Sequence, residues 1–172
     1  MRRGMALTGL LWLGLMLGII GSYEFTLHTG REVVLQTVPV DPRDLFRGDY
    51  VVLSYGANTL DLTSLPNDVE RLVHGQTVYV ALNTNGPHAA PVAVSAARPS
   101  GDAAFLKGRV EWASGRQIRV TYGLESFFVP EGKGRTLERA RGKSLEVIAV
   151  VDRSGRAVIK ALRLNGVPVT FR

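Results

Sequence analysis

Two polar segments carry the side chains that could take part in catalysis or binding. One is DPRDLFRGDYVVLSY at residues 41–55, and the other runs from Tyr122 to Glu138. Two carboxylates held about 5–9.5 Å apart across a cleft can share the acid and base roles of a hydrolase. The candidate residues are Asp41, Arg43, Asp44, Arg47, Gly48, Asp49, Tyr50, Leu53, Tyr55, Tyr122, Glu125, Glu131, Arg135 and Glu138. The same charges can instead form solvated ion pairs, each worth about 0–1 kcal/mol.

The first segment predicts a rigid turn that leads into a strand. Pro42 fixes one backbone torsion of the turn, and Gly48 permits a positive φ just before the strand. The residues that follow are apolar on both faces of that strand, which predicts a central position in a sheet. We expect the turn and the loop at residues 125–138 to form one polar surface, with Arg43, Arg47 and Asp49 presented beside the strand.

Several classes of site are excluded or disfavoured by composition. The chain has no cysteine, so disulfides, thiolate nucleophiles and cysteine-bound metals are ruled out. Its three histidines, His28, His74 and His88, lack metal-ligand spacing. The net charge of +6 is dispersed, without basic runs interleaved with aromatics, so no nucleic-acid partner is predicted. The sequence predicts no metal and no cofactor.

An apolar segment near the N-terminus indicates a membrane anchor. Residues 4–23 contain no charged side chain, and a helix of that length spans about 30 Å, the thickness of a bilayer core. Arg2 and Arg3 precede it, which predicts a cytoplasmic N-terminus and an extracytoplasmic, periplasmic remainder at the inner membrane. A cleavable signal peptide is the alternative, although small residues are not placed well for cleavage. Gly14 and Gly18 have the spacing of a helix-dimerisation motif, so a homodimer is also considered.

The rest of the chain alternates short β-branched runs with turn signals. This pattern predicts a mainly β domain, an antiparallel sandwich or partly open barrel of eight or nine strands, behind one N-terminal transmembrane helix. Hairpins are expected about Ser114-Gly115 and Ser154-Gly155. One short helix is expected in LPNDVERLVHGQ at residues 65–76, capped by Asn67 or Asp68 and ended by Gly75. The expected organisation is a cytoplasmic stub (1–3), an anchor (4–23), a spacer (24–30) and the β domain (31–172).

Residues Gly48 to Tyr55 spell GDYxxLxY, and on this motif the chain resembles the GDYXXLXY family of bacterial membrane-anchored proteins. PVDPRDLFRGDY at 39–50, VTYGLESFFVPEGKGRTLE at 120–138 and GRAVIKALRLNG at 155–166 are similar to further parts of the family pattern. The resemblance implies a small anchored protein that occurs beside, or fused to, multi-pass membrane domains. It implies no particular reaction.

Two kinds of function follow from these features. The first is a binding module outside the membrane that works with a multi-pass membrane protein through its polar loops. The second is a membrane-bound hydrolase, either built on carboxylates such as Asp49 with Glu125 or Glu131, or similar to signal peptidases, which RGDYVVLSY resembles. Those peptidases follow their serine with a Met-x-Pro segment, whereas Ser22 is followed here by Tyr-Glu-Phe. The chain is therefore expected to be a binding module more than an enzyme.

Overall fold

The computed structural model describes residues 2–38, 50–69, 71–129 and 145–170. One helix and eleven strands make up the regular structure of these residues, together with a single 3₁₀ turn, η1 (Gly56–Asn58). The elements are α1 (Arg2–Thr29), β1 (Arg31–Gln36), β2 (Tyr50–Val52), β3 (Thr59–Asp61), β4 (Thr77–Asn83), β5 (Ala90–Ser95), β6 (Phe105–Ser114), β7 (Gln117–Thr121), β8 (Ser126–Phe128), β9 (Leu145–Val151), β10 (Ala157–Leu164) and β11 (Val167–Pro168). The sequence pattern gave a lower strand count because β3, β8 and β11 are only two or three residues long.

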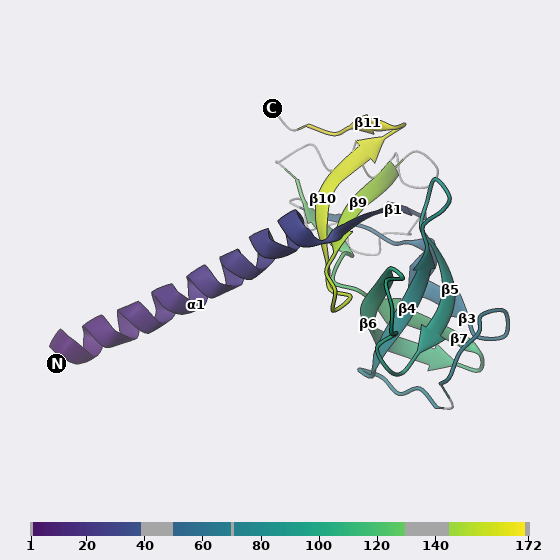
Figure 1. Cartoon of the computed structure of the whole chain (residues 1–172), viewed down its shortest axis with the longest axis horizontal. Helices are drawn as coiled ribbons and strands as arrows, with labels where there is room; N and C mark the ends of the chain where they lie inside the picture. Colours follow the sequence, from purple (N-terminus) through teal and green to yellow (C-terminus); the bar gives the residue numbers. More distant parts are fainter. Residues whose placement is uncertain (1, 39–49, 70, 130–144, 171–172) are drawn as a thin grey trace.

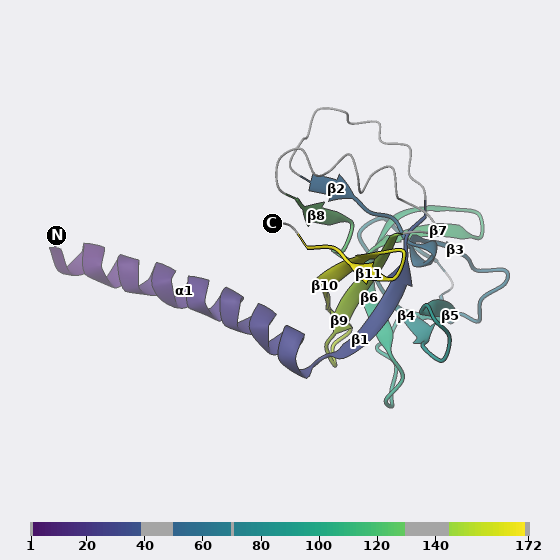
Figure 2. The same ribbon diagram turned by 90° about the horizontal axis from the view of Figure 1, so that it is seen from above.

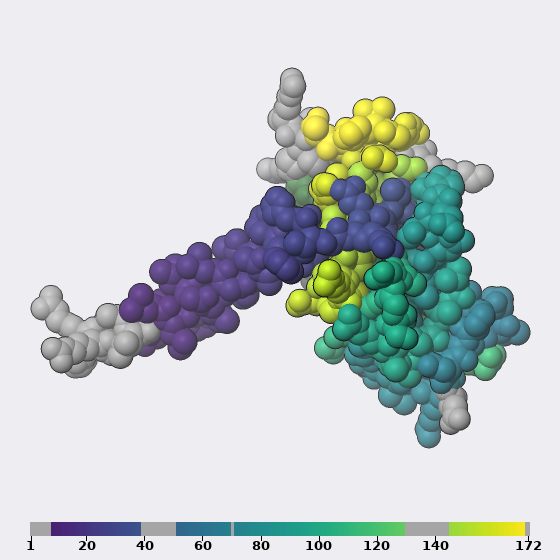
Figure 3. All heavy atoms as spheres, viewed as in Figure 1, coloured from purple at the N-terminus to yellow at the C-terminus, as the bar shows by residue number. Residues whose placement is uncertain are grey.

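Helix α1 stands clear of the β domain along most of its length (Figures 1 and 3). Large apolar side chains are exposed on every face of it, among them Leu11 (73 %), Leu13 (56 %) and Leu17 (60 %). Residues 8–29 form the one described helix that is long and apolar enough to span a membrane. A helix that is apolar all round needs either a protein core or a bilayer around it, and the β domain does not enclose this one.

The helix also extends beyond the expected anchor. Residues 24–29, set apart in the sequence as a spacer, continue the helix to Thr29, and Gly30 then separates α1 from β1. A β-carbon at Gly30 would lie 2.5 Å from a side-chain carbon of Val150 and 2.8 Å from the carbonyl oxygen of Thr26. Only glycine therefore lets the helix end this close to strand β9, which joins the anchor directly to the sheet.

The strands form a mainly β, nearly closed, barrel-like domain, which confirms the predicted fold class (Figure 2). Its sheets have the orders β1-β9-β10-β11 and β3-β7-β6-β4-β5, with β2 and β8 as a separate pair. All strand pairings between these elements are antiparallel. The core lies between the sheets, and its largest fully buried side chains include Leu35, Leu53, Tyr55, Leu60 and Leu106.

Both predicted hairpins are present. Strands β9 and β10 turn about Ser154 and Gly155, as expected. In the β6–β7 hairpin, Ser114 is the last strand residue and pairs with Gln117, so the turn residues are Gly115 and Arg116, one position later than predicted. The difference arises because Gly115 itself takes the positive φ (59°) that such a tight turn requires.

The helix expected at residues 65–76 was wrong. Asn67 instead forms an isolated bridge with Val94, and its amide donates to the carbonyl oxygens of Leu62 and Leu65. The side chain of Asp68 accepts the N–H of Ala96. Asn67 and Asp68, which were predicted to cap a helix, thus bond to backbone groups of a loop and of the residues after β5. Asparagine and aspartate side chains can satisfy backbone groups in either setting.

The predicted central position of the strand after Gly48 does not hold for β2 itself. The residues just beyond β2 do pair with a second segment, since Tyr55 forms an antiparallel bridge with Thr37 and the carbonyl oxygen of Ser54 accepts the N–H of Val38 at 2.8 Å. Strand β2 pairs only with β8 among the described residues, and Val52 is 37 % exposed while Val51 is fully buried. β-Branched residues suit any pleated surface, including a partly solvated one, so an apolar run does not by itself specify burial on both faces.

Candidate functional site

The structure describes part of the predicted polar surface. Tyr50 lies in β2, and Leu53, Tyr55, Tyr122 and Glu125 are described with their side chains. The remaining candidates lie outside the described residues, and they are Asp41, Arg43, Asp44, Arg47, Gly48, Asp49, Glu131, Arg135 and Glu138. The site is therefore described from residues 50–55 of the first motif and residues 120–129 of the second.

Strands β2 and β8 bring the two motifs side by side (Figure 2). Tyr50 pairs with Phe128, and Val52 pairs with Ser126, in antiparallel register. Beyond the strand, the backbone N–H of Leu53 donates to the carbonyl oxygen of Glu125 at 2.9 Å. The first motif and the second signature, about seventy residues apart in the chain, thus form one continuous structure.

Two tyrosines, one from each motif, each donate a hydrogen bond to the backbone of the opposite segment. The Tyr55 hydroxyl donates to the carbonyl oxygen of Leu124 at 2.6 Å, and the Tyr122 hydroxyl donates to the carbonyl oxygen of Ala57 at 2.5 Å. Their exposed fractions are 2 % and 7 %. Each tyrosine therefore satisfies a backbone carbonyl of the opposite segment inside the core, where an unpaired carbonyl would be costly.

Asn58 links Tyr55 to Glu125 and was not anticipated from the sequence. Its side-chain oxygen accepts the N–H of Tyr55 at 2.6 Å. Its amide group donates to the carbonyl oxygen of Val120 at 2.8 Å and to Oε1 of Glu125 at 3.1 Å. The only sequence signal is an asparagine three residues after a motif tyrosine, and such asparagines are frequent in exposed turns. This one is 1 % exposed and makes its bonds inside the core.

Glu125 accepts hydrogen bonds through both carboxylate oxygens. Oε1 accepts the N–H of Tyr122 at 2.7 Å as well as the Asn58 amide, and Oε2 accepts the N–H of Gly123 at 2.8 Å. Gly123 has a φ of 81°, which suits the tight turn that the carboxylate closes. Glu125 therefore holds the turn between β7 and β8.

Burial raises the pKa of Tyr55 and of Tyr122 far above the ordinary value of 10, and the negative charge of Glu125 raises both further. Both phenols consequently remain neutral hydrogen-bond donors at physiological pH. We refer to Tyr55, Asn58, Tyr122 and Glu125 as the motif junction. Chemically it is a network of hydrogen bonds that positions the ends of β2 and β8.

The fold and the motif junction define a class of protein: a small barrel-like β domain carried by one N-terminal apolar helix. The chain belongs to the GDYXXLXY protein family, whose model matches residues 12–162. The match confirms the resemblance seen in the sequence and extends from within α1 into β10. Neither the curated proteins nor the solved structures that were compared gave a match.

Proposed function

We propose that this protein is a membrane-anchored binding module whose β domain works with a multi-pass membrane protein. The observation that carries the proposal is the motif junction. The four residues of the motif junction make their hydrogen bonds within the domain, and the β2–β8 pair holds the two motifs side by side. A rigid scaffold that supports polar loops is a typical arrangement for recognition.

The apolar helix supplies the anchor in this proposal. Arg2 and Arg3 favour a cytoplasmic N-terminus, so the β domain would lie on the periplasmic side of the inner membrane. Because α1 runs without a break to Thr29 and Gly30 joins it closely to β9, the domain is held near the bilayer surface. A partner that spans the membrane would be within its reach.

A membrane-bound hydrolase is less well supported. Carboxylate chemistry with Glu125 would require a carboxylate that can reach a substrate, yet its two oxygens accept three hydrogen bonds within the domain. For a signal-peptidase-like reaction, Ser22 would need a neutral lysine nearby. Its hydroxyl donates to the carbonyl oxygen of Ile19 within α1, and Lys160 forms an ion pair with Glu32.

The binding proposal is tested by recovering the full-length protein from detergent-solubilised membranes and identifying bound proteins by mass spectrometry. Asp49→Asn/Glu131→Gln removes two charges from the proposed polar surface. Asp61→Asn/Glu111→Gln removes two charges from strands β3 and β6 and serves as the matched control. We expect one membrane protein to be recovered with the wild type and the control but not with the first variant. Recovery of all three samples without a partner would overturn the proposal, and equal recovery would overturn the assigned surface.

We further propose that α1 pairs with a second copy through Gly14 and Gly18. A β-carbon added at either glycine would meet no atom within 4 Å, so that face of the helix is open to a close neighbour. Energy transfer between differently labelled full-length chains in vesicles tests this. Gly14→Ile/Gly18→Ile should abolish the transfer, while Gly9→Ile should leave it unchanged. Equal transfer in all three would contradict a dimer built on this pair.

A further inference from the structure

A hollow of about 570 Å³ lies where α1 ends and β1 begins. Thr29 and Arg31 line it from the helix–strand junction, and Arg98 and Arg153 line it from loops of the domain. Phe105 and Val151 supply apolar wall. This volume falls within the roughly 300–1,000 Å³ typical of small-molecule sites. We call it the arginine pocket.

The protein itself holds two of the three arginines in place. Nη1 of Arg31 donates to the carbonyl oxygen of Asp102 at 2.8 Å, and Nη2 of Arg98 donates to that of Arg153 at 2.7 Å. The Arg98 guanidinium also lies 6.0 Å from the centre of the Phe105 ring. A guanidinium has five N–H donors, so each of these contacts leaves donors for a ligand. Among the described residues the side chain of Arg153 makes no hydrogen bond or ion pair.

The acids in the pocket do not neutralise these cations fully. The carboxylate of Asp152 accepts hydrogen bonds within the β9–β10 turn. Its Oδ1 accepts the backbone N–H groups of Ser154 and Arg156, and its Oδ2 accepts the Nε–H of Arg156 at 3.2 Å. Burial works to raise the pKa of Asp152, but the bonds from Ser154 and Arg156 outweigh it and lower that pKa. Asp102 is the remaining carboxylate in the lining. The pocket therefore favours binding of an anion, and the negative charge of Asp102 weakens that binding.

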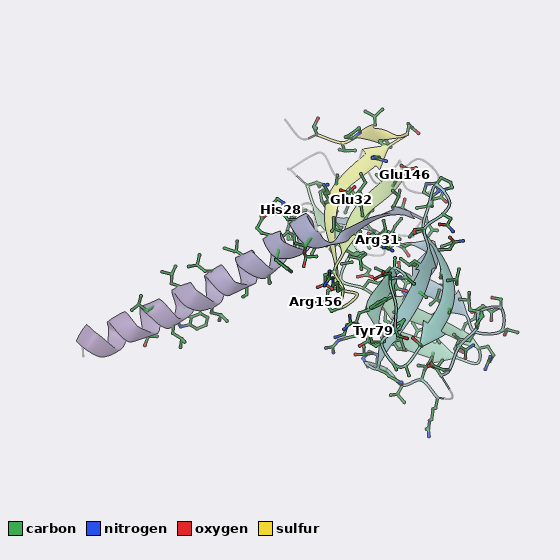
Figure 4. All side chains as sticks on the ribbon, viewed as in Figure 1. His28, Arg31, Glu32, Tyr79, Glu146 and Arg156 are labelled. Atoms are coloured by element: carbon green, nitrogen blue, oxygen red, sulfur yellow. The ribbon has the colours of Figure 1, made fainter. Side chains whose placement is uncertain are left out.

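The position of the pocket points to the membrane surface. The apolar span reaches Thr29, two residues before Arg31. Beyond the hydrocarbon core, the headgroup layer occupies roughly 5–7 Å on each side of a bilayer. Figure 4 shows His28 near the end of α1, with Arg31 and Arg156 close to where the helix meets the domain. With α1 in the bilayer, the arginine pocket opens at about the level of lipid headgroups.

We propose that the arginine pocket binds the phosphate group of an anionic phospholipid through Arg31, Arg98 and Arg153. Guanidinium groups bind phosphate with paired, charge-assisted hydrogen bonds, and several of them converge here. The inference rests on the proposed function in one respect only, that α1 lies in a membrane. Bound lipid would fix the orientation of the domain over the bilayer.

The test measures lipid binding by native mass spectrometry on the full-length protein in uncharged detergent. The probes are phosphatidylglycerol, a glucosyl-diacylglycerol without phosphate, and glycerol 3-phosphate without acyl chains. We expect phosphatidylglycerol to bind at least about tenfold more tightly than either of the others, and its binding to weaken as salt rises. Equal binding of the two lipids would overturn the phosphate assignment, and equal binding of glycerol 3-phosphate would overturn the lipid assignment.

Variants connect the binding to the pocket. Arg153→Gln removes an exposed side chain that makes no hydrogen bond or ion pair with the described residues, so we expect folding to be preserved and Kd for phosphatidylglycerol to rise about tenfold. Arg153→Lys should bind between Arg153→Gln and the wild type, because it keeps the charge but not the paired donors. Asp102→Asn should lower Kd about threefold by removing the opposing carboxylate. Arg71→Gln is the control for loss of one exposed positive charge. Equal Kd values for Arg153→Gln and Arg71→Gln would overturn the proposal.

Carbonate extraction of membranes containing the same proteins separates the two proposals. If the wild type stays with the membrane but shows no preference for phosphatidylglycerol, the arginine pocket assignment is wrong and the anchor stands. If carbonate releases the protein, the anchor is wrong, and so is the lipid assignment that depends on it.

Discussion

The Tyr55 hydroxyl lies 2.6 Å from the carbonyl oxygen of Leu124 and donates a hydrogen bond to it within the core. The residue that ends the GDYxxLxY motif is thereby joined to the second signature. The Tyr122 hydroxyl makes the reverse connection to Ala57. The family motif therefore has a structural role, because its last tyrosine bonds the segment after β2 to the turn before β8. Asn58 and Glu125 complete the motif junction.

The first prediction concerns these hydroxyl groups. Tyr55→Phe and Tyr122→Phe should each lower the free energy of unfolding by about 1–3 kcal/mol, because each leaves a buried carbonyl without its donor. Denaturant unfolding of the full-length protein in detergent measures the change. Tyr79→Phe is the control, since Tyr79 is half-buried and its ring packs edge-on against Phe105. If all three substitutions had the same small effect, the tyrosine bonds would not stabilise the fold.

Glu125 allows a second test, which separates a structural carboxylate from a catalytic one. Glu125→Ala removes the acceptor of three N–H bonds and should destabilise the protein by about 2–4 kcal/mol. Glu125→Gln keeps one acceptor oxygen and should recover part of that loss. Thermal unfolding followed by near-ultraviolet circular dichroism compares them. Wild-type stability in Glu125→Ala would contradict the role assigned here.

The raised tyrosine pKa values predict a loss of stability in alkali. In the unfolded chain a tyrosine loses its proton near pH 10, whereas Tyr55 and Tyr122 keep theirs in the folded protein. Their stabilising contribution is complete below pH 10 and is lost as pH rises above it toward the folded values. The unfolded state then binds fewer protons, so the free energy of unfolding falls by roughly 1.4 kcal/mol per pH unit for each tyrosine.

Alkaline titration of the phenolate absorbance checks this prediction. Two of the five tyrosines should titrate only when the protein unfolds. In Tyr55→Phe/Tyr122→Phe the stability should fall less steeply above pH 10 than in the wild type. Equal slopes would show that other groups govern the alkaline loss.

Gly155 offers a test of packing between the sheets. A β-carbon there would lie 2.6 Å from the Phe105 ring and 2.9 Å from the backbone nitrogen of Lys107, and φ is +83°. Gly155→Ala should therefore separate the β9–β10 turn from β6 and cost about 2–4 kcal/mol. Gly115→Ala has a similar positive φ (+59°) but open space, so it should cost only about 1 kcal/mol. Denaturant unfolding compares the two variants, and equal losses would mean that backbone strain, not the contact with β6, sets the cost.

The pairing of β2 with β8 can be tested by crosslinking. Val52 and Ser126 are direct partners and both are exposed, and the chain has no cysteine of its own. Val52→Cys/Ser126→Cys should form an intramolecular disulfide on mild oxidation, detected by the mass of the linked peptides. Val52→Cys/Ser95→Cys, which joins strands of different sheets, should not. Failure of the first pair to crosslink would contradict the register.

The sequence alone determined the features that depend on local pattern. An uninterrupted apolar stretch predicts the helix because its length and lack of charge are sufficient, and alternating β-branched runs with Ser-Gly turns predict the hairpins β6–β7 and β9–β10. The motif itself indicated the family. These properties follow from neighbouring residues, whose spacing is fixed by the chain.

Only the tertiary structure decided which polar residues meet. Glu125 appeared to be a candidate acid until its oxygens were seen to accept N–H groups from Asn58, Tyr122 and Gly123. Asn67 appeared to cap a helix, but it bonds to Leu62 and Leu65. Asn58 and Glu125, like Tyr55 and Leu124, are distant along the chain and are brought together by burial of the core, which no local pattern specifies. For the same reason, the arginine pocket exists only where Arg31, Arg98 and Arg153 converge in the fold.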